Sequence, residues 1–341
     1  MADQQLPTVS VLIPAYNYAQ YVERAIQSAL SQDYPPELLT VVVVDDGSTD
    51  ATAAVVASLV ERNPGRIVFI QQPNSGPSAA INRALDAATG DLVAVLDADD
   101  IWLPAKTRRQ VQLLASDPKL GLVFCDMQVV DGQERLVRPS QVGNIGAFPR
   151  RAFAQLLCQN VVTQSSLMVR RSLAKQIPAG VPYSDWWFAI CAAQTTELLY
   201  LPEPLALYRE HGANLTSAAS GVAGVREHRK EVSFQLWALR NLDLTSLTPA
   251  EVQLVWRGVE AHAARAMSSA NSYFMELAQV AEADTARALG LVAEADAASA
   301  RGDVSAQCSL LLQSLGWNPY DPELHVAFLE ATGRALQDSV V

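Results

Sequence analysis

The chain has 341 residues, enough for two domains, and half of them are hydrophobic, which is typical of a globular protein. Lys and Arg number 25 against 36 Asp and Glu, a formal net charge of -11, so we expect no nucleic-acid partner. The sequence contains no apolar run of the roughly 18 residues that a transmembrane helix needs, and its N-terminus does not resemble a signal peptide. The four scattered cysteines favour buried thiols in a cytoplasmic protein and argue against a zinc site.

After a short tail at residues 1–8, predicted strands and helices alternate as far as residue 97. The predicted strands are VSVLIP, LTVVVV, RIVFIQQ and DLVAVLD, and the helices between them are YVERAIQSALSQ, ATAAVVASLVERNPG and SAAINRALDAATG. Continuous apolar runs with β-branched residues are typical of strands buried on both faces. Because such crossovers are right-handed, the pattern predicts a Rossmann-like α/β fold, with a mostly parallel sheet and helices on both faces.

Beyond residue 97 the pattern changes twice. LGLVFCDMQVV and SSLMVRR are predicted strands, separated by an irregular stretch at 132–149, and after about residue 220 the chain is almost wholly helical. The segment from Ala300 to Arg334 weakly matches tetratricopeptide-type repeats. We therefore predict a first domain at 9–220 and an all-helical domain at 221–341. The second domain is expected to contact a protein partner or form a homodimer, the alternative being that it only supports the first domain.

Polar residues follow three of the predicted strands, in PAYN (14–17), DDGSTD (45–50) and DADD (97–100). Each of these stretches alone could be ordinary turn chemistry, since Asp, Asn, Gly and Ser are typical of loops. Ligands of an open parallel sheet, however, bind outside the carboxyl ends of the strands. Three such stretches at one edge therefore predict a binding site.

The DADD stretch indicates which ligand this site takes. Asp97 and Asp99 occupy alternate positions, so their side chains can aim at one point, and Ala98 leaves room for a ligand to approach. Two repelling carboxylates favour a bound divalent cation, and oxygen ligands favour Mg²⁺ or Mn²⁺. Such an ion commonly bridges to phosphates, so we expect a diphosphate ligand. The sequence contains neither a GxGxxG dinucleotide motif after the first strand nor a P-loop.

Four motifs, in order, carry a resemblance to a known family: VSVLIPAYNYAQYVERAIQSALSQ, VVVVDDGSTDAT, NSGPSAAINRALDAATGDLVAVLDADD and YREHGANLT. From residue 9 to about 216 the chain resembles the family 2 glycosyltransferases of GT-A fold. The resemblance implies transfer of a sugar, with inversion, from a nucleoside diphosphate sugar to an acceptor hydroxyl, in a hexosyltransferase of polysaccharide or glycoconjugate biosynthesis. It makes UDP and dTDP the leading nucleotides and Mn²⁺ or Mg²⁺ the cofactor.

The resemblance also implies roles for individual residues. The residues implied to bind the nucleotide sugar are Pro14, Ala15, Tyr16, Asn17, Asp45, Asp46, Asn74, Gly76, Asp97 and Ala98. Of these, Asp46 or Asp45 would hydrogen-bond the base, and Asp97 would contact the ribose or the metal. Tyr16 could stack on the base or simply pack in the core. The metal would be held by Asp99 and by His211, unless His211 is an ordinary loop histidine.

The general base of the family is an acid in an ED or DD pair before an aromatic-rich helix. The matching stretch VPYSDWWFAICAAQ offers Asp185, with Ser184 in place of the first acid. Asp185 could equally be the N-cap of that helix. Trp186 and Trp187 could stack on a sugar face, although one of them is expected in the core.

Two other functions fit parts of the pattern. A nucleotidyltransferase of sugar phosphates also uses an α/β sheet, carboxylates and Mg²⁺, but normally has a glycine-rich basic loop that PAYNYAQYV lacks. A catalytically silent scaffold that still binds sugar nucleotides would act through its helical domain. Intact DADD and Asp185 argue against that second alternative.

Overall fold

The structure is a computed structural model that describes residues 6–143, 145–211, 222–267, 282–319 and 321–338. The chain divides into two compact units: Met1–Ala152 with Asn160–Ser217, and Phe153–Gln159 with Ala218–Val341. This division differs from a single boundary near residue 220, because Phe153–Gln159 packs with the helical unit. The two units are therefore described separately.

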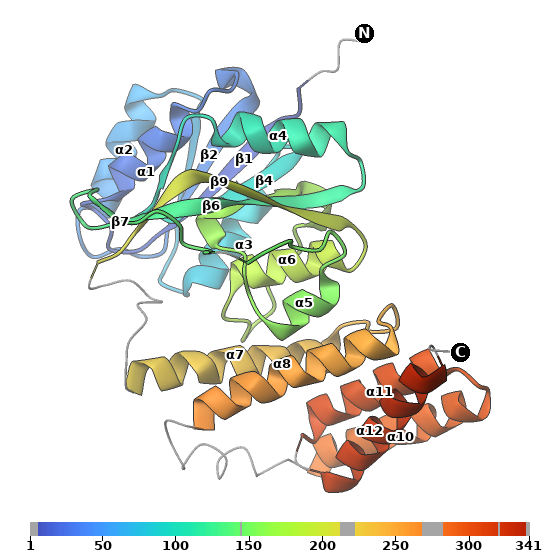
Figure 1. The fold of residues 1–341 in the computed structure, drawn as a ribbon. Helices are drawn as coiled ribbons and strands as arrows, with labels where there is room; N and C mark the ends of the chain where they lie inside the picture. The colour runs from blue at the N-terminus through green and yellow to red at the C-terminus, as the bar shows by residue number, and fades with distance from the viewer. Residues whose placement is uncertain (1–5, 144, 212–221, 268–281, 320, 339–341) are drawn as a thin grey trace. The chain divides into compact units, whose positions relative to one another are not determined.

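The first unit is built on one twisted sheet (Figure 1). Its strands in the described residues are β1 (Val9–Ala15), β2 (Leu39–Asp45), β3 (Ile67–Gln71), β4 (Leu92–Val95), β5 (Ile101–Trp102), β6 (Leu120–Val130), β7 (Leu136–Arg138), β8 (Leu167–Arg170) and β9 (Glu197–Arg209). The strand order is β3-β2-β1-β4-β8-β6-β9-β5, and β7 pairs with β6. Strands β1 to β4 pair in parallel, as the alternation of strands and helices predicts, whereas β8 is antiparallel to both β4 and β6.

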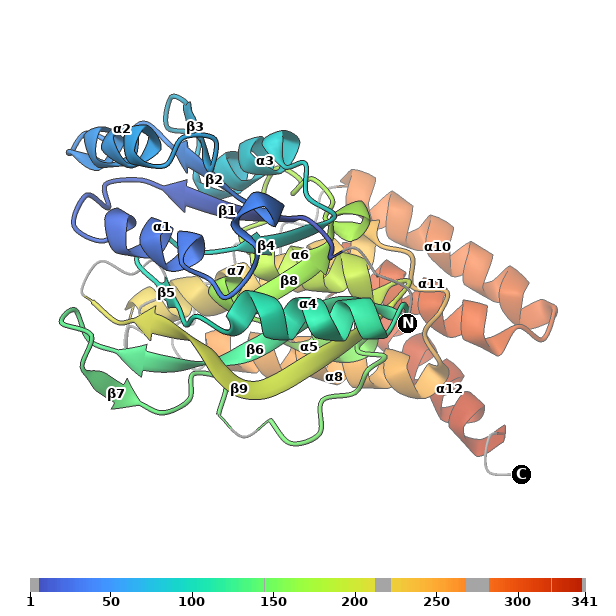
Figure 2. The ribbon, with the colours of Figure 1, turned by 90° about the horizontal axis from the view of Figure 1, so that it is seen from above.

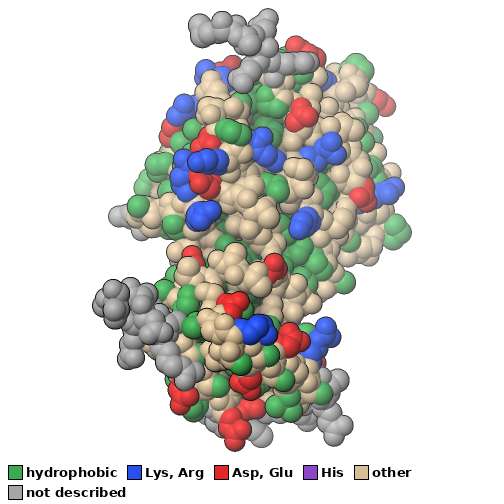
Figure 3. All heavy atoms as spheres, turned by 90° about the vertical axis from the view of Figure 1, so that its right-hand side faces the viewer, with side chains coloured by type: hydrophobic (Ala, Val, Ile, Leu, Met, Phe, Trp, Pro, Cys, Tyr) green, Lys and Arg blue, Asp and Glu red, His purple; other side chains and the backbone are tan. Residues whose placement is uncertain are grey.

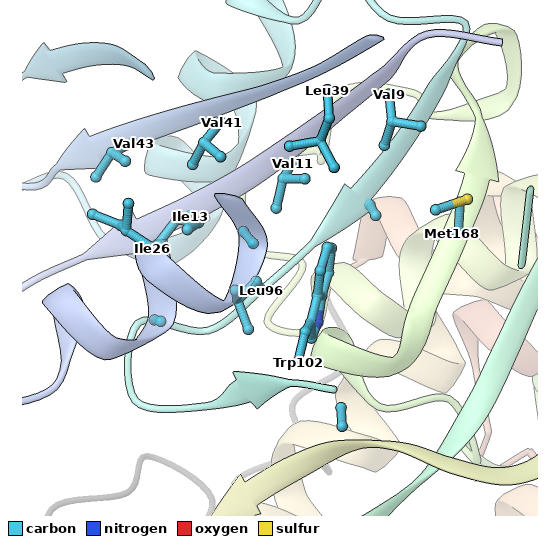
Figure 4. Close-up of a cluster of buried hydrophobic side chains, with 14 of the residues drawn as sticks. Val9, Val11, Ile13, Ile26, Leu39, Val41, Val43, Leu96, Trp102 and Met168 are labelled. Atoms are coloured by element: carbon cyan, nitrogen blue, oxygen red, sulfur yellow. The ribbon is translucent and has the colours of Figure 1, made fainter. Parts of the chain in front are cut away.

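Helices cover both faces of the sheet (Figures 1 and 2). They are α1 (Val22–Leu30), α2 (Thr52–Arg62), α3 (Pro77–Ala87), α4 (Lys106–Ser116) and α6 (Ser184–Ala193), joined by the short 3₁₀ turns Pro36–Leu38 (η1), Gln164–Ser166 (η2) and Arg171–Leu173 (η3). The core on the α1, α2 and α4 face includes Val11, Val41 and Ile26 (Figure 4). The alternate residues Leu12 and Val42 are also fully buried. The central strands are therefore buried on both faces, which explains their continuous apolar sequences.

The second unit is helical in its described parts. It comprises α5 (Phe153–Cys158), α7 (Val222–Asn241), α8 (Pro249–Met267), α10 (Glu282–Ala300), α11 (Val304–Trp317) and α12 (Pro322–Asp338). Gln235 of α7 donates hydrogen bonds from Nε2 to the carbonyls of Leu157 and Cys158, at 3.0 and 2.7 Å. These bonds satisfy carbonyls at the end of α5 that the helix itself leaves unpaired. Among the described residues, no helix combines the length and the apolar character needed to cross a membrane.

Candidate active site

The loop after β1 is tied to the loop after β2. Asn17 adopts a positive φ of 57°, a conformation that asparagine tolerates better than most residues. Its backbone N–H donates to Ser48 Oγ at 2.9 Å, and its side-chain Oδ1 accepts from the backbone N–H of Thr49 at 2.8 Å. Two of the predicted strand-end stretches therefore lie side by side, and the side chain of Asn17 is used to hold them together.

The loop after β2 is tied in turn to the loop before α3. Asp46 is buried, and its Oδ1 accepts from the backbone N–H of Ser75 while its Oδ2 accepts from that of Gly76, both at 2.9 Å. Gly47 has a φ of +74°, and a Cβ there would lie 2.7 Å from the backbone N of Asn74. The structure thus brings Asp46, Asn74 and Gly76 together as predicted, with Asp46 organising the loop.

Asp45 and Tyr16 differ sharply in exposure. Asp45 is 2% exposed and accepts from the backbone N–H of Ser48 at 3.1 Å, which closes the turn that follows β2. Tyr16 is 43% exposed, so it does not pack in the core. Pro14 is half-buried and Ala15 is buried at the end of β1. Of this group, Tyr16 presents the ring that a nucleotide base could reach.

In DADD, Asp100 is a structural carboxyl group. It is 2% exposed; its Oδ2 accepts from Ser165 Oγ at 2.6 Å, and its Oδ1 accepts from the backbone N–H of Arg209 at 3.0 Å. Burial, followed by repulsion from Asp99 and Asp97, raises its pKa well above the ordinary range. Asp100 therefore anchors the loop to β9 and to η2.

Asp97 faces a different environment. Burial raises its pKa to about 8, and the neighbouring carboxylates of Asp99 and Asp185 add to the shift. The side-chain amide of Gln164 donates to Asp97 Oδ1, which partly offsets these effects. Burial and the two like-charged neighbours therefore both disfavour the ionised form of Asp97. Ala98, beside it, is buried.

Asp99 and His211 form a polar pair in this site. His211 Nε2 lies 3.0 Å from Asp99 Oδ2, and the two side chains are 10% and 9% exposed. The Tyr18 hydroxyl also hydrogen-bonds Asp99, and burial together with this carboxylate raises the pKa of Tyr18. The imidazole of His211 stacks on the ring of Tyr21, with centroids 4.9 Å apart. Aromatic side chains that sequence reasoning left unassigned thus orient the predicted metal ligands.

The Asp99–His211 pair fits a divalent cation. Two neighbouring ligands of an octahedral ion at the usual Mg²⁺ distances lie about 3 Å apart, close to the separation seen here. A carboxylate oxygen such as that of Asp99 is a ligand that suits Mg²⁺ or Mn²⁺. In the described residues no group of three or more His, Cys, Asp or Glu is arranged to hold a metal. Mg²⁺ in proteins commonly takes several of its ligands from phosphate oxygens and water.

Arg209 is a buried residue to which sequence reasoning assigned no role. Its Nε donates to the carbonyl of Asp99 at 2.9 Å, and its other nitrogens donate to the carbonyl of Gly132 at 3.2 Å and to Glu134 Oε1 at 3.2 Å. The guanidinium also lies over the Tyr21 ring, 4.9 Å from its centroid. Arg209 therefore links β9, the DADD loop and the turn between β6 and β7. Its place two residues before His211 is the only signal of this role in the sequence.

Asp185 lies in the first turn of α6, whose N-cap is Tyr183, so Asp185 is not the N-cap. Its Oδ1 accepts from the backbone N–H of Trp186 at 2.6 Å, and the side chain of Asn160 also hydrogen-bonds it. Burial nevertheless raises the pKa of Asp185 to about 6. Asp185 is close enough to Asp97 to raise that residue's pKa, so the structure brings the two predicted carboxylates to one site.

The two tryptophans after Asp185 belong to the core. Trp186 is 1% exposed and Trp187 is 6% exposed, and Trp187 Nε1 donates to the carbonyl of Lys175 at 3.0 Å. The expectation that one of them stacks on a sugar is wrong, because α6 is buried along most of its length.

On the face that Figure 3 shows, Lys and Arg side chains are interspersed with Asp and Glu.

Known proteins resemble this chain in sequence and in fold. The sequence model described as Glycosyl transferase family 2 matches residues 10–177. The chain is 32% identical to an uncharacterized glycosyltransferase of Nostoc sp. over 238 residues, which cover 67% of this chain and 72% of that protein. It is 33% identical to the succinoglycan biosynthesis protein ExoO of Rhizobium meliloti over 165 residues, covering 48% of this chain and 46% of the relative.

Solved structures resemble the fold over most of the chain. A mannosyltransferase from Pyrobaculum calidifontis, in complex with GDP-Man and Mn²⁺, has a TM-score of 0.55 at 21% identity and covers 92% of this chain and 87% of its own. Residues 1–349 of TarS from S. aureus, in complex with UDP-GlcNAc, have a TM-score of 0.58 at 19% identity and cover 96% and 89%. These likenesses confirm the predicted GT-A fold with a helical C-terminal region.

Proposed function

Because the chain belongs to the family 2 glycosyltransferases, we propose that it transfers a hexose, with inversion, from a nucleoside diphosphate sugar to an acceptor hydroxyl. The observation that carries this proposal is the pairing of Asp99 with His211, together with Asp185 of α6 near the neighbouring Asp97. The Asp99–His211 pair suits a cation beside a diphosphate, and the separate carboxylate of Asp185 suits a general base. Such a division of tasks is what displacement of a diphosphate by a hydroxyl requires.

The donor is proposed to lie along the strand-end loops. Tyr16 is exposed there for stacking on the base, and the Asp46-held loop at 74–76 borders it. UDP and dTDP are the nucleotides that the motifs favour, and two structurally similar proteins are bound to UDP-GlcNAc and GDP-Man. All of these ligands share a diphosphate, so Asp97, Ala98 and Asp99 are proposed to approach that group.

Asp99 and His211 are proposed to hold Mn²⁺ or Mg²⁺. When bound, the ion would supply positive charge that stabilises the leaving diphosphate. His211 Nε2 and Asp99 Oδ2 lie 3.0 Å apart, so the two proposed ligand atoms already face one point. Tyr21 stacking and Arg209 then keep the imidazole and the DADD backbone in place.

Asp185 is proposed to be the general base. As the acceptor oxygen forms a bond to the anomeric carbon, the bond from that carbon to the diphosphate breaks, and the acceptor proton passes to Asp185. The pKa of about 6 leaves Asp185 mostly ionised at neutral pH while keeping it a stronger base than an ordinary aspartate. The hydrogen bond from Asn160 keeps its carboxylate oriented.

The two alternative functions have less support. A separate buried acid such as Asp185 is not needed by a nucleotidyltransferase of sugar phosphates. A silent scaffold would have no use for a carboxyl group whose pKa is raised to about 6. The cytoplasmic location, and a partner or homodimer contact through the helical region, remain predictions; exposed Val326 and Leu329 on α12 are consistent with such a contact.

A binding experiment tests the proposal without knowledge of the acceptor. We expect UDP, dTDP or GDP to raise the melting temperature of the protein in the presence of Mn²⁺ but not of EDTA, because a ligand that binds the native state stabilises it. Asp99→Asn should abolish the shift while remaining folded. Asp33→Asn, a matched change at an exposed aspartate that pairs with Arg108, should leave it unchanged. Equal binding in EDTA, or full binding by Asp99→Asn, would contradict the proposal.

A further inference from the structure

The segment from Asn160 to Ser165 joins the two candidate carboxylates, Asp97 and Asp185. At one end, the side chain of Asn160 hydrogen-bonds Asp185. At the other end, the side-chain amide of Gln164 donates to Asp97 Oδ1, and Ser165 Oγ accepts from the backbone N–H of Asp97 at 3.0 Å. One short stretch of chain therefore contacts both the carboxylate on the donor side and the carboxylate on the acceptor side.

Ser184 closes this connection from the helix side. The Ser184 hydroxyl donates to Gln164 Oε1, and Ser184 is the first residue of α6, directly before Asp185. An amide group accepts at its oxygen and donates at its nitrogen. Because Ser184 occupies the oxygen of Gln164, the amide nitrogen is turned toward Asp97. Ser184, Gln164 and Asp97 thus form a continuous chain of hydrogen bonds from α6 to the DADD loop.

A neutral bridge suits this position for an electrostatic reason. Asp97 and Asp185 are both acidic, and Gln164 lies between Asp97 and Ser184 at the end of α6 that bears Asp185. A cationic side chain between the two carboxyl groups would also hold them together. It would, however, neutralise the negative charge that is proposed to attract the cation bound with the donor. An amide and a hydroxyl fix the separation without adding charge.

We propose that Gln164 and Ser184 are positioning residues that hold Asp97 and the Asp185-bearing end of α6 in a fixed relative position. This inference rests on the proposed function, since it assigns the two carboxylates to the donor and to the acceptor. Gln164 acts on Asp97 directly. Ser184 acts only through Gln164, so its effect should vanish when the amide is absent.

The test is a double-mutant cycle with Gln164→Leu and Ser184→Ala. Turnover is measured as hydrolysis of UDP-GlcNAc or GDP-Man with Mn²⁺, and affinity as binding of UDP or GDP by calorimetry. We expect Ser184→Ala to lower kcat about 5-fold with little change in affinity, since a lost hydrogen bond to a neutral group typically costs about 1 kcal/mol. Gln164→Leu should lower kcat and also weaken binding about 10-fold, because it removes the hydrogen bonds to both Asp97 and Ser184. The double variant should be no worse than Gln164→Leu alone.

Two further variants separate positioning from general destabilisation. Ser166→Ala removes another hydroxyl of the same 3₁₀ turn, which bonds the carbonyl of Thr163 at 2.6 Å, and should leave kcat unchanged. Ser184→Thr keeps a hydroxyl and should retain most of the turnover. The inference would be overturned if the double variant lost kcat by the product of the two single losses, or if Ser166→Ala lost as much kcat as Ser184→Ala. It would also be overturned if the two substitutions were non-additive in the free energy of unfolding but not in kcat. Failure of the unaltered protein to bind any nucleoside diphosphate would instead contradict the proposed function.

Discussion

Asp185 combines partial burial with two hydrogen bonds that favour its charged form, and burial prevails, so its pKa rises to about 6. Replacing it by Asn keeps its size and should leave the fold intact. We expect Asp185→Asn to lose at least about 10²-fold in turnover, because general-base assistance is typically worth about 10²- to 10⁴-fold. The affinity for a nucleoside diphosphate with Mn²⁺ should change little, which calorimetry checks. A collapse of binding together with turnover would place Asp185 in the nucleotide site instead.

The same residue predicts a pH dependence. A base must be deprotonated to act, and the ionised fraction of Asp185 increases as the pH rises through about 6. Turnover of the unaltered protein should therefore increase between about pH 5 and pH 7. Asp185→Asn should lose this increase in its residual rate. If the turnover of Asp185→Asn still increased with pH over this range, the increase would belong to another titrating group.

Lys106 is a buried cation outside the site. It is 0% exposed on α4, its Nζ donates to Gln110 Oε1 at 2.8 Å, and it lies 3.9 Å from the centroid of the Trp102 ring. Burial lowers the pKa of Lys106 from 10.5 to about 8. Between these two values the unfolded chain binds more protons than the folded one, so the free energy of unfolding should increase with pH.

The predicted gain from Lys106 is up to about 3 kcal/mol between pH 8 and pH 10.5, since one pKa unit corresponds to about 1.4 kcal/mol. Urea unfolding at several pH values gives the slope of the free energy of unfolding against pH. The contribution of Lys106 is the difference in this slope between the unaltered protein and Lys106→Met. The exposed Lys119→Met is the matched control and should keep the slope of the unaltered protein. If the free energy of unfolding changed with pH equally in Lys106→Met and the unaltered protein, Lys106 would be protonated to the same degree in the folded and the unfolded chain.

At the scale of helices and strands, Gly258 of α8 marks a close approach to α5. A Cβ at this position would lie 2.7 Å from both Cα and Cβ of Cys158, and backbone atoms cannot move aside cheaply. Gly258→Ala should therefore lower the free energy of unfolding by roughly 1–3 kcal/mol, as overpacking commonly does.

The matched control is the same substitution in α10, Gly290→Ala, where nothing lies within 4 Å of the added Cβ. Alanine is the better helix former, so this change should stabilise by about 0.5–1 kcal/mol. Thermal unfolding of the two variants should thus shift in opposite directions. Equal shifts would mean that α5 and α8 are not in the contact described here.

The elements that the sequence predicts well are those with a local pattern. The continuous apolar runs at Val9–Pro14 and in VVVV identify β1 and β2, and the polar residues after them identify the site edge. Contacts made across long stretches of chain leave no such periodicity. Gln164 meets Asp97 from 67 residues away, and Arg209 meets the Asp99 carbonyl from 110 residues away. Neither residue could be assigned its role from spacing.

The short helix α5 shows a second limit of sequence reasoning. FAQLLC reads as part of the first domain because strands of that domain lie on both sides of it in sequence. Its partners, Gln235 and Gly258, lie in α7 and α8, beyond the predicted boundary at residue 220. Apolar residues show that a helix is buried, but they do not show against which part of the chain.

At the scale of the whole molecule, this arrangement makes the division between the units discontinuous. A chain that ends at Ser217 would keep α5 but lose α7 and α8, the helices of the second unit that pack against it. Phe153, Leu156 and Leu157, all buried in the full chain, would then be exposed. We expect this truncated chain to aggregate, and co-expression of residues 218–341 to restore part of its solubility. Sedimentation and soluble yield measure both outcomes; a soluble, monomeric truncated chain would contradict the expectation.

The place of α5 in the chain also has a consequence for biosynthesis. A ribosome adds about 5–20 residues per second, and roughly 100 residues separate Cys158 from Gly258. About 5–20 s therefore pass between the synthesis of α5 and the synthesis of the part of α8 that packs against its apolar side. During that interval the nascent chain presents an unpaired hydrophobic helix, which is the kind of segment that chaperones bind. Slowing translation between residues 160 and 258 should lengthen this exposure, whereas slowing it after residue 267 should not.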